Sequence, residues 1–329
     1  MIVLQIHSGL GNQLFMYAAA RALSEKRRAD LYLDVDTDCM LGVNHGQGVG
    51  HSFQLDRFRI KARLLDRAPV LSGAALSSAG AISTIKARLR KVAVLRKAVR
   101  LLRENGIDLV NAATEAVVND TRLYREKYGD WGYKPEFFEL EDNTILRGCF
   151  FSFRYFDWME EDIRRELSLK APLSPQSAIL ERRIDATNSV SIHFRRGDVI
   201  TNPEYRSWYE GVVTESYYRN AIEYIRARLD NPHFYIFSDD IDWVRHHFGI
   251  NGEVTYVDHN GPERGYEDLH LMSRCRHNVT AGFSSFSWWA AYLNRNPGKI
   301  VVRTRRMNAL PHLDHPHDFF PAGWIAVDS

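Results

Sequence analysis

The sequence predicts an α/β protein built from two doubly wound domains. Apolar, strand-like runs alternate with amphipathic, helix-like runs at the start of the chain and throughout its second half. This alternation is typical of parallel sheets covered by helices on both faces. The chain has 329 residues, more than one hydrophobic core usually serves, which favours two domains. A proline-containing break at 170–175 separates them, so we expect domains at 1–170 and 171–329.

The first domain opens with a β-α-β unit. The pattern predicts a strand over residues 2–6, a tight glycine turn over 8–11, a helix over 12–28 and a strand over 31–35. Such units approach ligands at the glycine turn. Further along this domain we expect a glycine-rich loop over 36–60, strands near 114–118 and 144–150, and a helix over 157–167.

A basic amphipathic helix is expected at 81–103, inside an insertion of about 66–105. Apolar residues recur there at three- and four-residue steps, eight Lys or Arg fill other positions, and no acidic residue interrupts the run. Such a helix can pack on its domain with a basic face in solvent. It can also attach peripherally to an anionic membrane surface. RNA binding is a weaker third interpretation.

Composition excludes several classes of protein. A formal net charge of +2 argues against a dedicated nucleic-acid binder. The three cysteines, Cys39, Cys149 and Cys275, include no Cys-x-x-Cys pair and predict neither a disulfide framework nor a zinc ribbon. No apolar run reaches the roughly 18 residues of a membrane span, and no signal-like segment opens the chain. We expect a cytoplasmic protein.

The second domain shows regular alternation of helices and strands. Helices are expected at 175–186, 216–230, 241–248, 266–275 and 285–294, and strands at 189–194, 233–237, 253–257, 277–281 and 299–303. Ligands of such sheets bind just beyond the carboxyl ends of the strands. The residues that follow each strand are therefore the candidate site.

The strand at 189–194 ends in anion-binding chemistry. His193 lies at its end, and Arg195, Arg196, Gly197 and Asp198 follow. Two planar guanidinium groups match the oxygens of a phosphate or diphosphate better than two ammonium groups would. Glycine allows the backbone to turn or to approach a ligand. Alone, the motif is equally compatible with two solvated arginines after a strand.

Two other strand ends add complementary groups. Asp239 and Asp240 could accept hydrogen bonds from a guanine edge or a ribose, or could cap the next helix. Ser284, Ser285 and Ser287 precede or open a helix whose first amides could bind a phosphate, although serines there can be simple caps. A nucleoside diphosphate would satisfy all three strand ends.

Two other patterns suggest different ligands but are weaker. Gly9-x-Gly11 with Asp34 resembles a dinucleotide fingerprint and would suit an NAD-dependent dehydrogenase, but Leu14 stands where a small residue is due. The pattern Asp34-x-Asp36-x-Asp38 and the group of His312, Asp314, His315 and His317 resemble metal sites. Paired arginines already supply the positive charge a metal would provide, so we expect no metal.

Four sequence blocks resemble glycosyltransferase family 11, in the bacterial branch of its GDP-fucose-dependent α-1,2-fucosyltransferases. They are Gly9-Leu10-Gly11-Asn12-Gln13-Leu14-Phe15, His193-Phe194-Arg195-Arg196-Gly197-Asp198, Phe237-Ser238-Asp239-Asp240, and the pair Tyr266-Glu267-Asp268-Leu269 with Ser284-Ser285-Phe286-Ser287-Trp288-Trp289. Together they span nearly the whole chain.

The resemblance implies a GT-B fold of two facing Rossmann-like domains, with the GDP-sugar on the C-terminal domain and the acceptor largely on the N-terminal side. It implies transfer of L-fucose from GDP-β-L-fucose, with inversion, to the 2-hydroxyl of a terminal β-galactoside in a cell-surface glycan or its lipid-linked precursor. No cofactor or metal is implied. The implied donor-binding residues are Gly9, Gly11, His193, Arg195, Arg196, Asp239, Asp240, Ser284, Ser285, Phe286 and Ser287.

We expect Arg195, Asn12, Asp198 and Glu204 to be the catalytic residues. The resemblance points to Arg195 and Asn12, whereas Asp198, Glu204 and His7 are candidates for the general base. Phe283 and the segment Glu210-Gly211-Val212 depart from the residues common in the family, as does the insertion at 66–105. These departures bear on the acceptor rather than on the reaction. Transfer of another GDP-deoxysugar such as colitose, and non-catalytic binding of a nucleotide sugar, remain alternatives.

Overall fold

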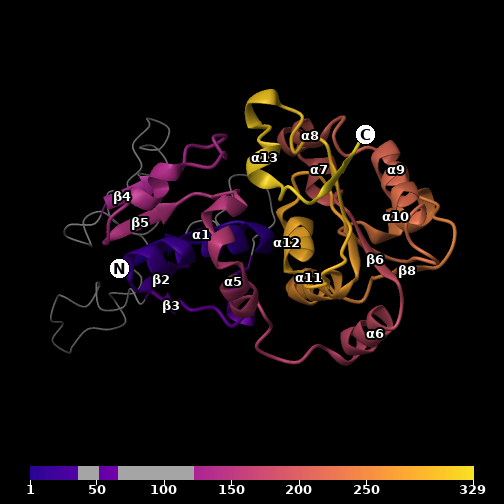
Figure 1. The fold of residues 1–329 in the computed structure, drawn as a ribbon, viewed down its shortest axis with the longest axis horizontal. Helices are drawn as coiled ribbons and strands as arrows, with labels where there is room; N and C mark the ends of the chain where they lie inside the picture. Colours follow the sequence, from indigo (N-terminus) through magenta and orange to yellow (C-terminus); the bar gives the residue numbers. More distant parts are fainter. Residues whose placement is uncertain (36–51, 66–121) are drawn as a thin grey trace, which may run out of the picture.

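A computed structural model describes residues 1–35, 52–65 and 122–329. It contains two parallel sheets, which confirms the predicted α/β class. The first sheet has the order β3-β2-β1-β5-β4, and the second has the order β11-β10-β9-β6-β7-β8. Figure 1 shows the two sheets in separate halves of the molecule, which we call the N-terminal and C-terminal units.

The strands of the first sheet are β1 (Ile2–Gln5), β2 (Leu31–Asp34), β3 (Arg63–Leu64), β4 (Arg122–Arg125) and β5 (Thr144–Arg147). Those of the second are β6 (Ser189–Phe194), β7 (His233–Ser238), β8 (Val254–Tyr256), β9 (His277–Val279), β10 (Val301–Thr304) and β11 (Ile325–Val327). The central strand β6 is buried at every position, as expected for a parallel strand with helices on both faces.

The α-helices are α1 (Leu10–Arg27), α5 (Glu160–Glu166), α6 (Pro175–Asp185), α7 (Gly197–Thr201), α8 (Pro203–Tyr209), α9 (Glu215–Arg226), α10 (Ile241–His247), α11 (Gly265–Arg274), α12 (Ser285–Leu293) and α13 (Pro316–Phe319). Short 3-10 turns are η1 (Leu55–Arg57), η2 (Pro135–Glu139), η3 (Phe153–Tyr155), η4 (Asp157–Met159), η5 (Pro262–Arg264) and η6 (Pro311–Leu313).

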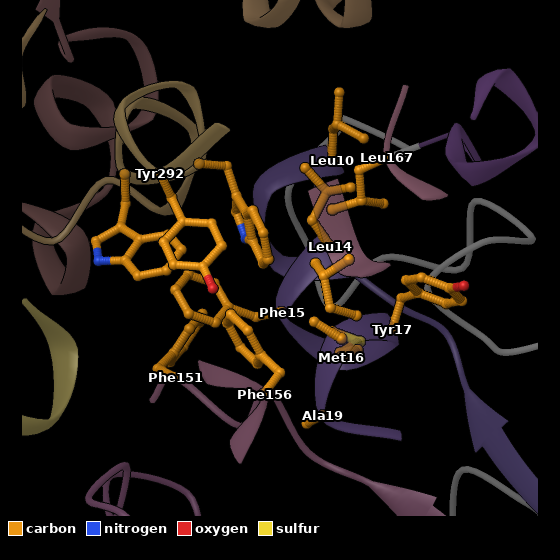
Figure 2. Close-up of a cluster of buried hydrophobic side chains, with 14 of the residues drawn as sticks. Leu10, Leu14, Phe15, Met16, Tyr17, Ala19, Phe151, Phe156, Leu167 and Tyr292 are labelled. Carbon is orange, nitrogen blue, oxygen red and sulfur yellow. The ribbon is translucent and has the colours of Figure 1, made fainter. Parts of the chain in front are cut away.

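Two helices join the units. In Figure 1, α1 of the N-terminal unit lies beside α12 of the C-terminal unit. Phe15 of α1 packs on Trp288 and Trp289 of α12, with ring centroids 4.5 and 5.1 Å apart. Figure 2 shows Phe15 gathered with Phe151, Phe156 and Tyr292 in this buried cluster. Burial of so many aromatic rings fixes the two helices relative to each other.

Several element boundaries differ from those predicted. The first helix begins at Leu10, so Gly9 is its N-cap and Gly11 lies inside its first turn rather than in a preceding loop. The predicted strand at 144–150 ends at Arg147, because the backbone turns at Phe150, which has a φ of 52°. Six elements were not predicted, namely β3, β4, β11, α7, α8 and α13.

Several sequence predictions fall outside the described residues. They are the strand at 114–118, the basic helix at 81–103 with its surrounding insertion, and Cys39, Asp36 and Asp38. Within the described ranges, no helix has the length and apolar character needed to cross a membrane. Contact with an anionic membrane and a cytoplasmic location stay predictions, as does the boundary at 170, which lies in the connection from β5 to β6.

Candidate active site

The end of β6 holds His193 in a buried setting. Its side chain is 5% exposed, its ring centroid lies 5.6 Å from that of Phe286, and its Nδ1 lies 3.5 Å from Ser284 Oγ. Burial lowers the pKa of His193 to about 4; the Asp239 carboxylate opposes this shift and Arg195 adds to it. The imidazole is therefore neutral at neutral pH and offers one donor and one acceptor nitrogen.

The two arginines that follow β6 are each paired with aspartates. Arg195 forms an ion pair with Asp239, and its Nη2 lies 2.6 Å from Asp198 Oδ2. Arg196 Nε donates to Asp240 Oδ2 at 3.2 Å, and its backbone N–H donates to Asp239 at 2.8 Å. The structure thus brings together the arginines of β6 and the aspartates that follow β7.

Trp243 and Gly197 lie beside these ion pairs and restrict the positions of Arg196 and Asp239. The Arg196 guanidinium carbon lies 3.2 Å from the ring centroid of Trp243, a cation–π contact. A Cβ at Gly197 would lie 2.8 Å from Asp239 Oδ2, so a larger residue there would displace this carboxylate. A small cavity of about 130 Å³ opens beside Arg195, Arg196 and Trp243.

The third group of candidate residues lies in the first turn of α12, which follows β9. Ser284 is the N-cap and accepts from the Ser287 N–H at 3.5 Å. Ser287 is 1% exposed; its Oγ accepts from the Ala281 N–H at 3.1 Å and donates to the Ser284 carbonyl at 3.3 Å. These two hydroxyls therefore shape the helix end. The Ser287 amide is taken up by the Ser284 hydroxyl, which leaves the Ser285 and Phe286 amides as the donors that could bind an anion.

Ser285 connects α12 to the N-terminal unit. Its Oγ donates to Asn12 Oδ1 at 2.6 Å. A Cβ at Gly11 would lie 2.5 Å from the backbone nitrogen of Phe286, so only glycine permits this approach of α1 to α12. Asn12 and Gly11 therefore stand at the first turn of α12 in the opposite unit.

The turn that precedes α1 is braced by Gln13. Its Nε2 donates to the carbonyls of Ser8 and Ser52 at 2.8 and 2.9 Å, and its Oε1 accepts from the Gln54 N–H at 3.1 Å. Ser8 has a φ of 64°, an uncommon value for a residue with a side chain, and its Oγ lies 2.9 Å from His7 Nδ1. Burial, followed by the Arg147 charge, lowers the pKa of His7 to about 4.

Two motif carboxylates lie away from the arginines. Glu267 accepts from Ser174 Oγ at 2.7 Å and from the Ser174 backbone N–H at 3.3 Å, which fixes the N-cap of α6. Asp268 accepts from Asn260 Nδ2 at 2.8 Å, and burial raises its pKa to about 7. This block therefore anchors the connection between the units.

Glu204 of α8 faces the N-terminal unit. Its Oε1 accepts from the Tyr128 hydroxyl at 2.6 Å. Asp198, by contrast, is committed to Arg195, and its Oδ1 is buried with no hydrogen-bond partner among the described residues. Sequence reasoning missed Tyr128 and Trp243 because neither stands in a strand-end motif.

The candidate metal ligands do not converge in the part of the chain that the structure describes. No group of three or more His, Cys, Asp or Glu residues there has the arrangement of a metal site. Asp314 instead accepts from the Met307 N–H at 2.8 Å and pairs with Arg306. The predicted metal independence stays a prediction.

Comparison with known proteins shows the family of this chain. Residues 133–328 match the model of glycosyl transferase family 11. The chain belongs to glycosyltransferase family 11. This confirms the resemblance carried by the sequence blocks and makes the protein a glycosyltransferase. The two parallel α/β units are those of its GT-B fold.

Relatives of this family 11 chain include bacterial and human proteins. An Escherichia coli α-1,2-colitosyltransferase is 28% identical over 331 residues, which cover 99% of each chain. The human galactoside α-(1,2)-fucosyltransferase 1 is 31% identical over 174 residues, covering 50% of this chain and 47% of the human protein. The fucosyltransferase NodZ from Bradyrhizobium is similar with a TM-score of 0.45 and 14% identity, over 88% of this chain and 92% of NodZ.

Proposed function

We propose that this family 11 enzyme transfers L-fucose from GDP-β-L-fucose to the 2-hydroxyl of a terminal β-galactoside in a cell-surface glycan or its lipid-linked precursor. The observation that carries the proposal is the convergence of three strand ends. Arg195 and Arg196 lie against Asp239 and Asp240, and the start of α12 lies beside His193. The proposed activity is the one for which the human relative, galactoside α-(1,2)-fucosyltransferase 1, is named.

The guanidinium groups provide the main electrostatic contribution. Transfer with inversion develops oxocarbenium-like charge on the sugar and negative charge on the departing diphosphate. Arg195 and Arg196 would face that negative charge, helped by the first amides of α12. Asp198 and Asp239 pair with Arg195 in this structure. They would have to give up some of these contacts so that the Arg195 guanidinium can bind the diphosphate. They would then be available to the nucleoside.

His193 and Asn12 have supporting roles in this proposal. A neutral His193 can hydrogen-bond the nucleotide without adding charge. Asn12 is fixed by Ser285 at the turn where the sugar would leave the diphosphate. Among the candidate bases, Asp198 is committed to Arg195, whereas Glu204 lies in the wall of a cavity. We therefore assign to Glu204 the role of general base for the acceptor hydroxyl.

Colitose is the second candidate donor sugar. The colitosyltransferase matches 99% of this chain, whereas the human fucosyltransferase matches half of it. Both sugars would arrive on the same GDP carrier, so the arginines cannot distinguish them. The choice depends on contacts to the sugar itself.

A donor and acceptor screen tests the proposal. Purified protein is incubated with GDP-fucose or GDP-colitose and a series of β-galactosides, GDP release is followed, and the product linkage is determined by NMR. We expect acceptor-dependent GDP release with GDP-fucose and an α-1,2 linkage. Preference for GDP-colitose would select the second candidate. GDP binding without turnover on any acceptor would indicate a non-catalytic binder.

A further inference from the structure

A cavity of about 470 Å³ opens between the two units. Its walls come from the chain after β4, from α8 and from the region of η6. The segment before η6 contacts α8 directly, because the Ala309 N–H donates to the Trp208 carbonyl at 2.8 Å. Small-molecule sites commonly measure roughly 300 to 1,000 Å³ and lie between domains. None of the strand-end motifs contributes to this cavity.

Aromatic rings form one side of the cavity. Tyr128 is 69% exposed although it is a large aromatic residue. Its ring centroid lies 5.7 Å from that of Trp131 and 6.4 Å from that of Trp208. Rings that combine an apolar face with a polar edge suit ligands that are apolar on one face and hydroxylated at the rim. A pyranose ring has this character.

Hydrogen-bonding groups accompany the rings. The Tyr128 hydroxyl donates to Glu204, and a carboxylate can accept about four hydrogen bonds, so Glu204 retains capacity for ligand hydroxyls. His315 also lines the cavity, and its Nε2 is buried with no partner among the described residues. An unpartnered buried nitrogen is costly unless a ligand or water contacts it.

The cavity lies next to the proposed donor site. Glu204 belongs to α8, which directly follows α7, the helix that carries Asp198. Burial first, and then the Asp198 and Glu204 charges, raise the pKa of Tyr205, while Arg195 lowers it. The Tyr205 hydroxyl therefore interacts electrostatically both with Glu204 of the cavity and with Asp198 and Arg195 of the proposed donor site. Helix α8 also lines both places, because Trp208 borders this cavity and Tyr209 borders the cavity beside Arg195.

We propose that this cavity is the acceptor subsite, in which Tyr128 and Trp208 pack against a hexopyranose ring and Glu204 and His315 bind its hydroxyls. This proposal rests on the proposed function and deepens it by naming the residues that select the acceptor. Both units contribute, which extends the expectation of an acceptor largely on the N-terminal side.

Variants at Tyr128 test the subsite with lactose as the probe. Tyr128→Ala removes the ring, and Tyr128→Phe removes only the hydroxyl that fixes Glu204. We expect the alanine variant to raise the KM for lactose at least about tenfold, as for aromatic anchors of binding sites, and the phenylalanine variant to raise it less. GDP affinity, measured by calorimetry, should be unchanged in both. Trp158→Ala is the matched control, because Trp158 is an aromatic residue that is 51% exposed but does not line the cavity.

Saturation-transfer NMR of lactose separates this proposal from the proposed function. If wild-type protein transfers no sugar but its lactose signal is lost in Tyr128→Ala, the proposed function fails and the subsite stands. If transfer occurs and Tyr128→Ala keeps the wild-type KM within about twofold, the subsite is wrong and the function stands. Absence of any lactose signal with the wild-type protein also overturns the subsite.

Discussion

Ser285 Oγ donates a hydrogen bond to Asn12 Oδ1 at 2.6 Å, although the two residues are 273 positions apart in the chain. This contact joins the first turn of α1 to the first turn of α12. The asparagine is thereby held at the helix end that we assign to the donor phosphates. A residue of the N-terminal unit thus belongs to a site otherwise built by the C-terminal unit.

Gly11→Ala should separate these two helices. The added Cβ would lie 2.5 Å from the Phe286 backbone nitrogen, which cannot move aside as a flexible side chain would. Overpacking of this kind costs about 1–3 kcal/mol. We expect the free energy of unfolding, measured with urea, to fall by that amount and turnover to fall with it. Gly249→Ala is the control, because no atom lies within 4 Å of its added Cβ; equal stability of the two variants would refute the close approach.

Arg195→Ala should reduce turnover at least about a hundredfold. Loss of one preorganised donor that faces developing charge costs about 2.7–4 kcal/mol. Arg195→Lys should recover little, because lysine lacks the planar fork that matches two phosphate oxygens. Steady-state GDP release measures both effects, with the exposed Arg228→Ala as control. Near-wild-type turnover of the lysine variant would remove Arg195 from the proposed role.

His193 should contribute a loss of stability at acidic pH, because its imidazole is neutral in the folded protein. Its pKa is about 4 when folded and near 6.5 when unfolded. Between these values the unfolded chain binds the extra proton, so the contribution of His193 to stability falls as the pH is lowered, by up to about 1.4 kcal/mol per pH unit. Between pH 7 and pH 5, the free energy of unfolding in urea should therefore fall relative to that of His193→Asn.

Comparison of the wild type with His193→Asn isolates the contribution of His193 to the pH dependence of stability. Burial raises the pKa values of Glu126 and Asp268 to about 7, which gives the opposite slope, but both groups are present in both proteins. Parallel pH profiles for wild type and His193→Asn would contradict a buried neutral histidine.

Glu267→Ala should destabilise the protein without weakening GDP binding. Glu267 is 3% exposed and accepts two hydrogen bonds from Ser174. Hydrogen bonds to charged groups contribute about 1.5–3 kcal/mol each. We expect a loss of at least about 1.5 kcal/mol in urea unfolding and an unchanged calorimetric affinity for GDP. A large loss of GDP affinity in the still folded variant would instead make Glu267 a donor ligand.

Much of the fold was predictable because its strands are short, apolar and bounded by polar residues. The expected strand at 189–194 has the bounds of β6. The start of α1 was predicted two residues late, because a glycine pair suggests a turn and only the contact with α12 explains Gly11 inside a helix. β4 (Arg122–Arg125) and β11 (Ile325–Val327) were missed because both are edge strands. Their residues are half-buried or exposed, so their sequences carry little apolar pattern.

The site was predictable where its residues follow strands and not where they meet from distant segments. His193 lies at the end of β6, Arg195 follows β6 and Asp239 follows the adjacent parallel strand β7, so the sheet brings them together. The pairing of Arg195 with both Asp198 and Asp239 depends on side-chain geometry that no spacing reveals. Tyr128 reaches Glu204 across the two units, a contact that only the tertiary structure shows.

A crystal structure of the protein with GDP would show where the diphosphate binds. We predict the diphosphate within hydrogen-bonding distance of the Arg195 guanidinium and the first amides of α12, with Asp239 at least partly released from Arg195. It also predicts that Asn12 remains bonded to Ser285 beside the terminal phosphate. A diphosphate bound elsewhere, with the pair of Arg195 and Asp239 intact, would contradict it.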